Sequence, residues 1–91
     1  MYFYLMYYTY ILYSEKLDKY YIGSTNDIER RLERHNQGHT PYTRIGIPWK
    51  LFYSEVYNTR KEAFVREQQI KKMKSRTYIE SLLGKGHPGE G

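Results

Sequence analysis

Apolar and aromatic residues gather in short runs near the N-terminus, with polar breaks between them. Residues 7–14 (YYTYILYS) are aromatic and β-branched, and the pattern resumes at residues 20–23 (YYIG) after a polar stretch. Two such runs across a short polar segment are typical of a β-hairpin. Residues 49–57 (WKLFYSEVY) have a similar composition and predict a third strand.

Three other segments begin with the residue pair of a capping box. In this pattern an Asn, Ser or Thr side chain and a Glu three positions later together cap the first helical turn. The pairs are Asn26 with Glu29, Thr59 with Glu62, and Thr77 with Glu80. They predict helices over residues 26–35, 59–74 and 77–84, the first of which ends in an Asn-Gln-Gly sequence suited to a left-handed exit. Glycines and prolines predict that residues 38–48 form a loop.

This order, β-β-α-β-α-α, predicts an α+β fold with a small three-stranded antiparallel β-sheet flanked by helices. Ninety-one residues provide for one domain. We expect the domain to span residues 7–84, after an N-terminal extension over residues 1–6. Residues 85–91 have nothing to bury and are expected to form a disordered tail.

Composition limits the class of protein. Twelve tyrosines, three phenylalanines and one tryptophan supply the apolar area that a small core needs. The absence of cysteine excludes disulfides and thiolate metal sites. The hydrophobic N-terminal stretch follows no basic region and is shorter than the ~20 residues of a membrane span, so we expect a cytoplasmic protein without a membrane partner.

The charge distribution points to nucleic acid. The chain carries 15 Lys and Arg against 10 Asp and Glu, a formal charge of +5. Seven basic residues lie between positions 60 and 76, and a second group lies in the first predicted helix. Clustered cations of this kind indicate a polyanionic partner. The residues expected to bind nucleic acid are Arg30, Arg34, Arg44, Lys71, Lys72, Lys74 and Arg76.

Arg31 and His35 occupy unusual positions in the first predicted helix. At ~100° per residue they share the face that Ile28 and Leu32 turn toward the sheet. Long cations avoid such a face unless a partner or an anion is present there. A purely structural explanation remains open for each residue. Arg31 could extend to the edge of the apolar stripe, and His35 could be a boundary histidine with its hydrogen bonds satisfied.

Glu67 is the corresponding anomaly in the second predicted helix, where it lies in the apolar stripe of Ala63, Phe64 and Ile70. A carboxylate there either pairs with Lys71 one turn later or binds a hard divalent cation, since Mg²⁺ prefers oxygen ligands and keeps several waters.

Two tyrosines complete the pattern. Tyr10 ends the triplet Tyr8-Thr9-Tyr10, and Tyr21 opens Tyr21-Ile22-Gly23, whose glycine leaves room for close approach of another group. With an arginine ten residues after Tyr21, a histidine four further on and Glu67 downstream, the order resembles that of the GIY-YIG nuclease family, specifically its small single-domain members. The resemblance runs from about residue 7 to residue 76.

The resemblance implies a stand-alone endonuclease that hydrolyses DNA phosphodiester bonds with one divalent cation, Mg²⁺ or Mn²⁺, in DNA repair or recombination. It gives Tyr21 the role of general base and Tyr10 that of orienting the water or phosphate. Arg31 would stabilise the phosphoryl charge, Glu67 would bind the metal, and His35 would support proton transfer. The chemistry is sound, because nearby cations lower the pKa of a phenol from its usual value of about 10.

Two other functions remain open. The first triplet lacks the Gly-Ile of the family but keeps its tyrosine. The chain has no asparagine after Asn58, where many family nucleases carry one, and a nucleic-acid-binding module that does not cleave is therefore the main alternative. A weaker one makes Tyr42, Trp49 and Tyr53 a base-stacking platform for single strands. The DNA substrate, structured or single-stranded, and the oligomeric state are left open.

Overall fold

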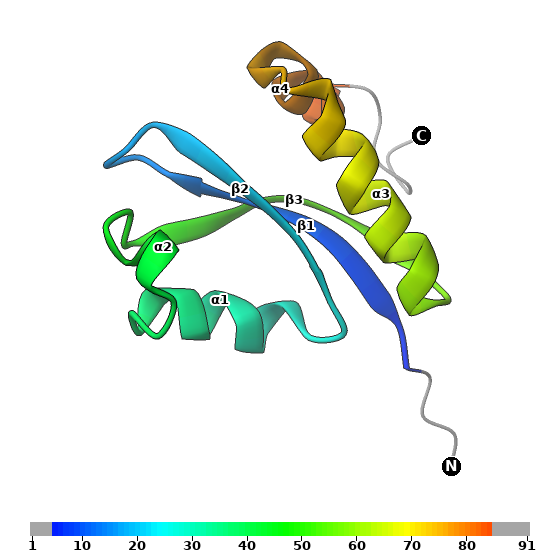
Figure 1. Cartoon of the computed structure of the whole chain (residues 1–91), viewed down its shortest axis with the longest axis horizontal. Helices are drawn as coiled ribbons and strands as arrows, with labels where there is room; N and C mark the ends of the chain where they lie inside the picture. Colours follow the sequence, from blue (N-terminus) through cyan, green and yellow to red (C-terminus); the bar gives the residue numbers. More distant parts are fainter. Residues whose placement is uncertain (1–4, 85–91) are drawn as a thin grey trace.

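The computed structural model describes residues 5–84 and contains one antiparallel sheet with strand order β2-β1-β3. The elements are β1 (Tyr7–Ser14), β2 (Lys19–Thr25), α1 (Ile28–Asn36), α2 (Pro41–Arg44), β3 (Trp49–Tyr57), α3 (Arg60–Met73) and α4 (Arg76–Gly84). Figure 1 shows α1 and α2 on one side of the sheet and α3 on the other. The predicted α+β fold with a three-stranded antiparallel sheet is confirmed.

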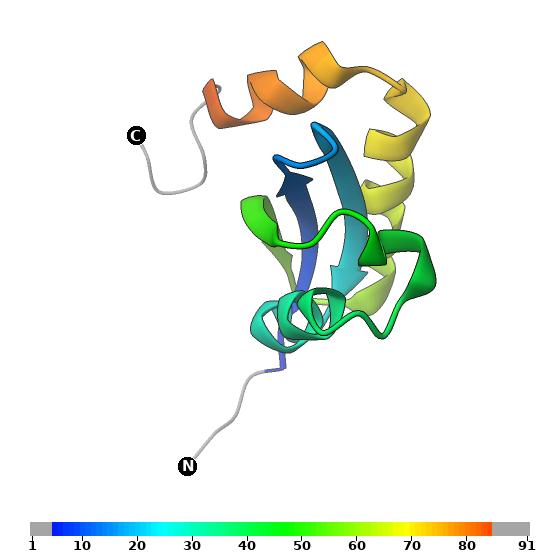
Figure 2. The same ribbon diagram turned by 90° about the vertical axis from the view of Figure 1, so that its left-hand side faces the viewer.

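The central strand β1 is buried on both sides, because successive side chains of a strand point to opposite faces. Ile11 belongs to one core cluster, which it shares with Tyr53 and residues of α3 and α4. Tyr10 and Leu12 belong to a second cluster with Trp49, against which α1 packs. Figure 2 shows the same arrangement from the side, with α1 and α3 separated by the strands. The sheet therefore carries two separate cores.

The strand β2 is longer than the predicted residues 20–23. It runs from Lys19 to Thr25, because Ser24 and Thr25 continue the pairing with β1 opposite Thr9 and Tyr8. Thr9 and Ser24 face α3: Thr9 Oγ1 donates to the Ala63 carbonyl at 2.8 Å, and Ser24 Oγ also bonds to α3. This polar end of β2 brings the candidate site to the edge of the sheet.

The first turn of α1 differs from the prediction. Asp27, not Asn26, is the N-cap, and its carboxylate accepts a hydrogen bond from the Arg30 backbone N–H at 3.1 Å. Both residue types cap well, so the sequence alone does not choose between them. The predicted left-handed exit is present, since Gly38 has φ +80°.

The predicted capping box of α3 is present in both directions between Thr59 and Glu62. That of α4 is wrong: the helix begins at Arg76, because Ser75 Oγ accepts a hydrogen bond from the Tyr78 N–H at 3.0 Å. A serine two residues before Thr77 thus takes the capping position.

Residues 38–48, predicted to be a loop, contain the one-turn helix α2 with Pro41 in its first turn. The segment is held by buried contacts. Trp49 Nε1 donates to the Thr43 carbonyl at 2.7 Å, and the Asn36 side chain bonds to the backbone N–H and carbonyl of Trp49. A single turn has no periodicity to detect in a sequence, which is why it escaped prediction.

The predicted tail over residues 85–91 lies outside the described residues, as does most of the predicted extension over residues 1–6. The domain limits at residues 7 and 84 stay a prediction. Within residues 5–84, no helix combines the length and the apolar character needed to cross a membrane.

Candidate active site

Tyr10 and Gly23 lie directly opposite each other on β1 and β2. Tyr10 is only 1% exposed, and a Cβ atom added to Gly23 would lie 2.6 Å from its hydroxyl oxygen and 2.7 Å from Cζ. Gly23 is therefore required by close approach and not by its backbone conformation. The phenol of Tyr10 occupies the space that a side chain at position 23 would fill.

Gly23→Ala should accordingly lower the free energy of unfolding by about 1–3 kcal/mol, the usual cost of overpacking. The added methyl group meets a buried ring that has no free space to enter. Urea denaturation measures the loss, and the same substitution in a Tyr10→Ala background is the control. If the cost is the same in both backgrounds, the contact between Tyr10 and Gly23 is not its cause.

Tyr21 points to the same side of the sheet as Gly23, two positions along β2. Its ring is edge-on to the imidazole of His35, with centroids 4.7 Å apart, and lies 6.4 Å from the ring of Tyr10. Trp49 contacts Tyr21 from a third direction at 6.3 Å. The two tyrosines and His35 thus form one aromatic cluster between the sheet and α1.

His35 is 1% exposed, and its Nδ1 lies 2.9 Å from Thr43 Oγ1. The Thr43 hydroxyl also lies 3.3 Å from the Thr40 carbonyl, and the tautomer of His35 decides which group donates in its contact with Thr43. Nε2 is the other nitrogen of the ring. It is buried and has no hydrogen-bond partner within the described part of the chain.

Burial lowers the pKa of His35, and the positive charges of Arg31 and Arg34 lower it further. Arg31 reaches the same cluster from α1. The neighbouring Tyr10 hydroxyl, which accepts from the guanidinium, raises the pKa of Arg31. Arg31 Nε is buried and, among residues 5–84, has no hydrogen-bond partner. Burial raises the pKa of Tyr10 although Arg31 opposes the shift, so this phenol keeps its proton near neutral pH.

The lowered pKa of His35 predicts that stability falls as the pH drops from about 7.5 to about 5.5. In the unfolded chain His35 binds a proton near pH 6.5, whereas the folded protein binds it only at lower pH. The unfolded state therefore gains protons first, and unfolding becomes easier by at most about 1.4 kcal/mol per pH unit.

Urea denaturation across this range measures the effect, and His35→Gln should reduce the slope. The carboxyls of Glu55 and Asp18, whose pKa values are lowered, titrate below this window and do not confuse the result. An equal slope in wild type and variant would assign the pH dependence to another group.

Glu67 approaches the cluster from the other face of the sheet. It is 8% exposed, with Oε1 accepting from Ser24 Oγ at 2.8 Å and Oε2 accepting from Lys71 Nζ at 2.6 Å. The pair with Lys71, one of the two alternatives from the sequence, is thus formed. The carboxylate is still near the tyrosines, since its charge contributes to the raised pKa of Tyr10.

The structure thus brings Tyr10, Tyr21, Arg31 and His35 together on the α1 side of β2 and places Glu67 across the same strand. Sequence analysis missed Ser24 and Thr43, which orient Glu67 and His35. Ser24 follows Gly23 directly and was detectable, but nothing in the sequence marks Thr43.

The residues around Glu67 fit a hard cation. No group of three or more His, Cys, Asp or Glu side chains in residues 5–84 is placed to hold a metal ion. Mg²⁺ needs fewer protein ligands, because it keeps several waters and binds through one or two carboxylates. Glu67 and Ser24 offer adjacent oxygens, and the Lys71 side chain, 46% exposed, has room to move away.

Comparison with known proteins identifies the family of the chain. The sequence profile of a family described as GIY-YIG catalytic domain matches residues 6–79. The chain belongs to the GIY-YIG family. It is 41% identical over 70 residues to a UPF0213 protein of Bacillus licheniformis, covering 72% of each chain. It is 45% identical over 64 residues to a UPF0213 protein of Streptococcus agalactiae, covering 65% of this chain and 72% of the other.

A solved structure extends the GIY-YIG comparison to the fold. The solution NMR structure of a UPF0213 protein from Bacillus halodurans superposes with a TM-score of 0.56 at 33% identity, covering 93% of this chain and 90% of that one. The chain therefore has the nuclease-like GIY-YIG fold from the first strand to the last helix.

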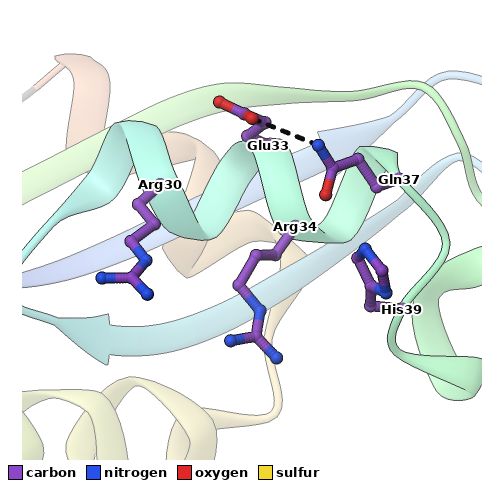
Figure 3. A pocket seen from close by; sticks show the side chains of 5 residues that line it. All are labelled: Arg30, Glu33, Arg34, Gln37 and His39. Carbon is purple, nitrogen blue, oxygen red and sulfur yellow. Dashed lines mark hydrogen bonds between the residues drawn. The ribbon is translucent and has the colours of Figure 1, made fainter.

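All seven residues predicted to bind nucleic acid in this GIY-YIG chain are exposed. Arg30 and Arg34 point the same way from α1 and, with His39, line an open hollow of about 410 Å³ (Figure 3). Arg76 is used within the fold, bonding to Asp18 at 2.5 Å and to Glu80 at 2.9 Å. It ties α4 to the turn between β1 and β2.

The prediction that Tyr42, Trp49 and Tyr53 form a base-stacking platform is wrong. Trp49 is 5% exposed and Tyr53 7% exposed, and they belong to core clusters on opposite sides of the sheet. These two rings stabilise the fold, and neither exposes a face on which a base could stack. Tyr42 alone is exposed, at 81%.

Proposed function

We propose that this GIY-YIG protein is a stand-alone endonuclease that hydrolyses DNA phosphodiester bonds with a divalent cation, Mg²⁺ or Mn²⁺. The observation that carries the proposal is the pair of buried nitrogens, Arg31 Nε and His35 Nε2, which lack hydrogen-bond partners among the described residues. Buried polar atoms are normally paired in native proteins, and exceptions call for a ligand or a catalytic role. A phosphate would satisfy the Arg31 donor.

Each side chain has a role that its geometry supports. Arg31 binds the phosphate and stabilises the charge that develops on it, from a site where burial strengthens the interaction. Tyr10, a neutral phenol beside Arg31, donates a hydrogen bond to orient the phosphate or the water. Tyr21 removes the proton from the attacking water, and the adjacent His35, in the tautomer that leaves Nε2 as an acceptor, supports that transfer.

Glu67 and Ser24 would hold the cation at the edge of β2. The cation would supply positive charge for the leaving oxygen. Before it binds, Lys71 must leave the Glu67 carboxylate, because it occupies Oε2 at 2.6 Å. The ion pair lies partly at the surface, where such pairs contribute about 0–1 kcal/mol, so the cost of breaking it is small.

The same ion pair favours one second candidate, a nucleic-acid-binding module that does not cleave. A lysine on the carboxylate already neutralises the charge that a metal would neutralise. Such a protein would bind DNA through its basic surface without any need of a cation.

A plasmid-nicking assay with Mg²⁺, Mn²⁺ or EDTA distinguishes the two. We expect nicking only with a metal, and a loss of about 10²-fold or more in Tyr21→Phe, which keeps the ring beside His35 and removes only the hydroxyl. Pure protein that binds DNA but leaves it intact across metals and pH would establish the binding module instead.

A further inference from the structure

A small recess of about 100 Å³ opens beside Tyr21. It lies between the turn of the β1–β2 hairpin and α2, which are neighbours in Figure 1. Its lining is mainly aromatic and aliphatic: Leu17, Lys19, Tyr20, Tyr21, Tyr42, Ile45 and Trp49. The recess shares Tyr21 with the proposed active site, so anything bound in it is held next to the reacting phosphate.

The rim of the recess exposes apolar side chains that the fold does not use. Tyr42 is 81% exposed and Ile45 is 63% exposed. The ring of Tyr42 is 6.5 Å from that of Tyr21, at 53° to it. Adjacent exposed apolar groups beside a polar site mark a place where a ligand binds.

Tyr42 is also held in place, although its ring is free of the core. The next residue, Thr43, is 1% exposed and bonds through its carbonyl to Trp49 Nε1 and through its hydroxyl to His35. The backbone that carries Tyr42 is thus anchored on both the core and the active site. A ring presented from a fixed backbone loses little freedom when it stacks on a ligand.

We propose that this recess binds an unpaired nucleobase next to the phosphate held by Arg31, with Tyr42 stacking on the base. The inference rests on the proposed function, because it takes the reacting phosphate to lie at Tyr21. A base inside a continuous duplex is stacked on both faces and cannot offer one to Tyr42. The preferred substrate class is therefore DNA with an unpaired nucleotide at the cleavage point, such as a single strand or a flap.

Size and charge favour this occupant over an apolar protein segment. The recess is smaller than the cavity of about 150 Å³ that holds a benzene ring, so it admits only the edge of one flat ring, whose face lies on the exposed ring of Tyr42, and it excludes the face of a helix. Lys19 at the rim offers ammonium donors to a base oxygen or a phosphate, in a chain with a formal charge of +5. Aromatic stacking beside basic groups is how proteins hold single strands without reading their sequence.

The test measures binding of the full chain in EDTA, so that cleavage does not enter. A single-stranded oligonucleotide carrying 2-aminopurine and a continuous duplex of the same sequence are titrated at low salt. We expect Tyr42→Ala to weaken single-strand binding about tenfold, duplex binding to change less than about twofold, and Tyr42→Phe to bind like wild type. Quenching of 2-aminopurine should occur with wild type and be lost in Tyr42→Ala.

Val56→Ala, at an exposed apolar position of β3 outside the recess, is the matched control and should behave like wild type. Equal losses on single strand and duplex, or none on either, would overturn the inference, as would wild type that fails to bind the single strand. Metal-dependent nicking would stand in each of these cases. Conversely, a protein that never cleaves yet shows the Tyr42-dependent quenching would support the recess and refute the nuclease.

Discussion

Glu67→Gln should reduce metal-dependent cleavage of DNA by about 10³-fold or more. A bound cation contributes several kcal/mol of charge stabilisation in the transition state, and each ~1.4 kcal/mol is a factor of ten in rate. The fold should be preserved, because the amide oxygen still accepts the Ser24 hydrogen bond and the lost pair with Lys71 is worth about 0.3–0.5 kcal/mol. Single-turnover cleavage, DNA affinity and thermal unfolding measure the three quantities.

Lys71→Gln is the matched control, since it breaks the same ion pair and keeps the carboxylate. It should cleave at a rate within a few-fold of wild type and need less metal, because the cation no longer displaces a lysine. If both variants lose activity and stability equally, the ion pair is structural. Wild-type activity in Glu67→Gln would remove Glu67 from the site.

Arg31→Lys should lower the cleavage rate by about 10²-fold or more with little change in DNA affinity. Lysine keeps the charge but cannot reproduce the planar fork of a guanidinium, which matches phosphate through two hydrogen bonds. The loss of one such interaction in a preorganised site costs about 10²- to 10³-fold. Single-turnover kinetics with an excess of protein separates the cleavage rate from binding.

Arg30→Lys and Arg34→Lys provide controls on the same helix. Both arginines are exposed on the outer face of α1, whereas Arg31 Nε is buried beside Tyr10. We expect both controls to cleave at nearly the wild-type rate. Similar small losses at all three positions would mean that α1 offers a diffuse basic surface, and Arg31 would have no separate role at the phosphate.

Much of this fold follows from local patterns. The aromatic and β-branched runs locate the strands, and the box formed by Thr59 and Glu62 sets the start of α3. The cap of α1 is not predictable, because Asn26 and Asp27 compete with nearly equal propensity. The turn α2 is stabilised by hydrogen bonds from Thr43 to Trp49 and His35, and no sequence pattern marks Thr43 as their partner.

The candidate site shows the same division. The helical wheel of α1 was enough to predict that Arg31 and His35 point toward the sheet, where Arg31 Nε and His35 Nε2 are buried. It could not show that Glu67 lies across β2 from them, because the sequence does not specify which face of the sheet each helix covers. The pairing of Glu67 with both Ser24 and Lys71 depends on that choice.

The placement of the site around β2 has a mechanical consequence. This strand is paired with β1 at each of its positions from Lys19 to Thr25, so the spacing between α1 and the Glu67 carboxylate is set by a hydrogen-bonded backbone. Within residues 5–84, a paired strand and not a loop therefore joins the two halves of the candidate site. On the proposed function, the bending needed to fit this edge would come from the nucleic acid, and we expect flexible strands to fit it better than a stiff double helix.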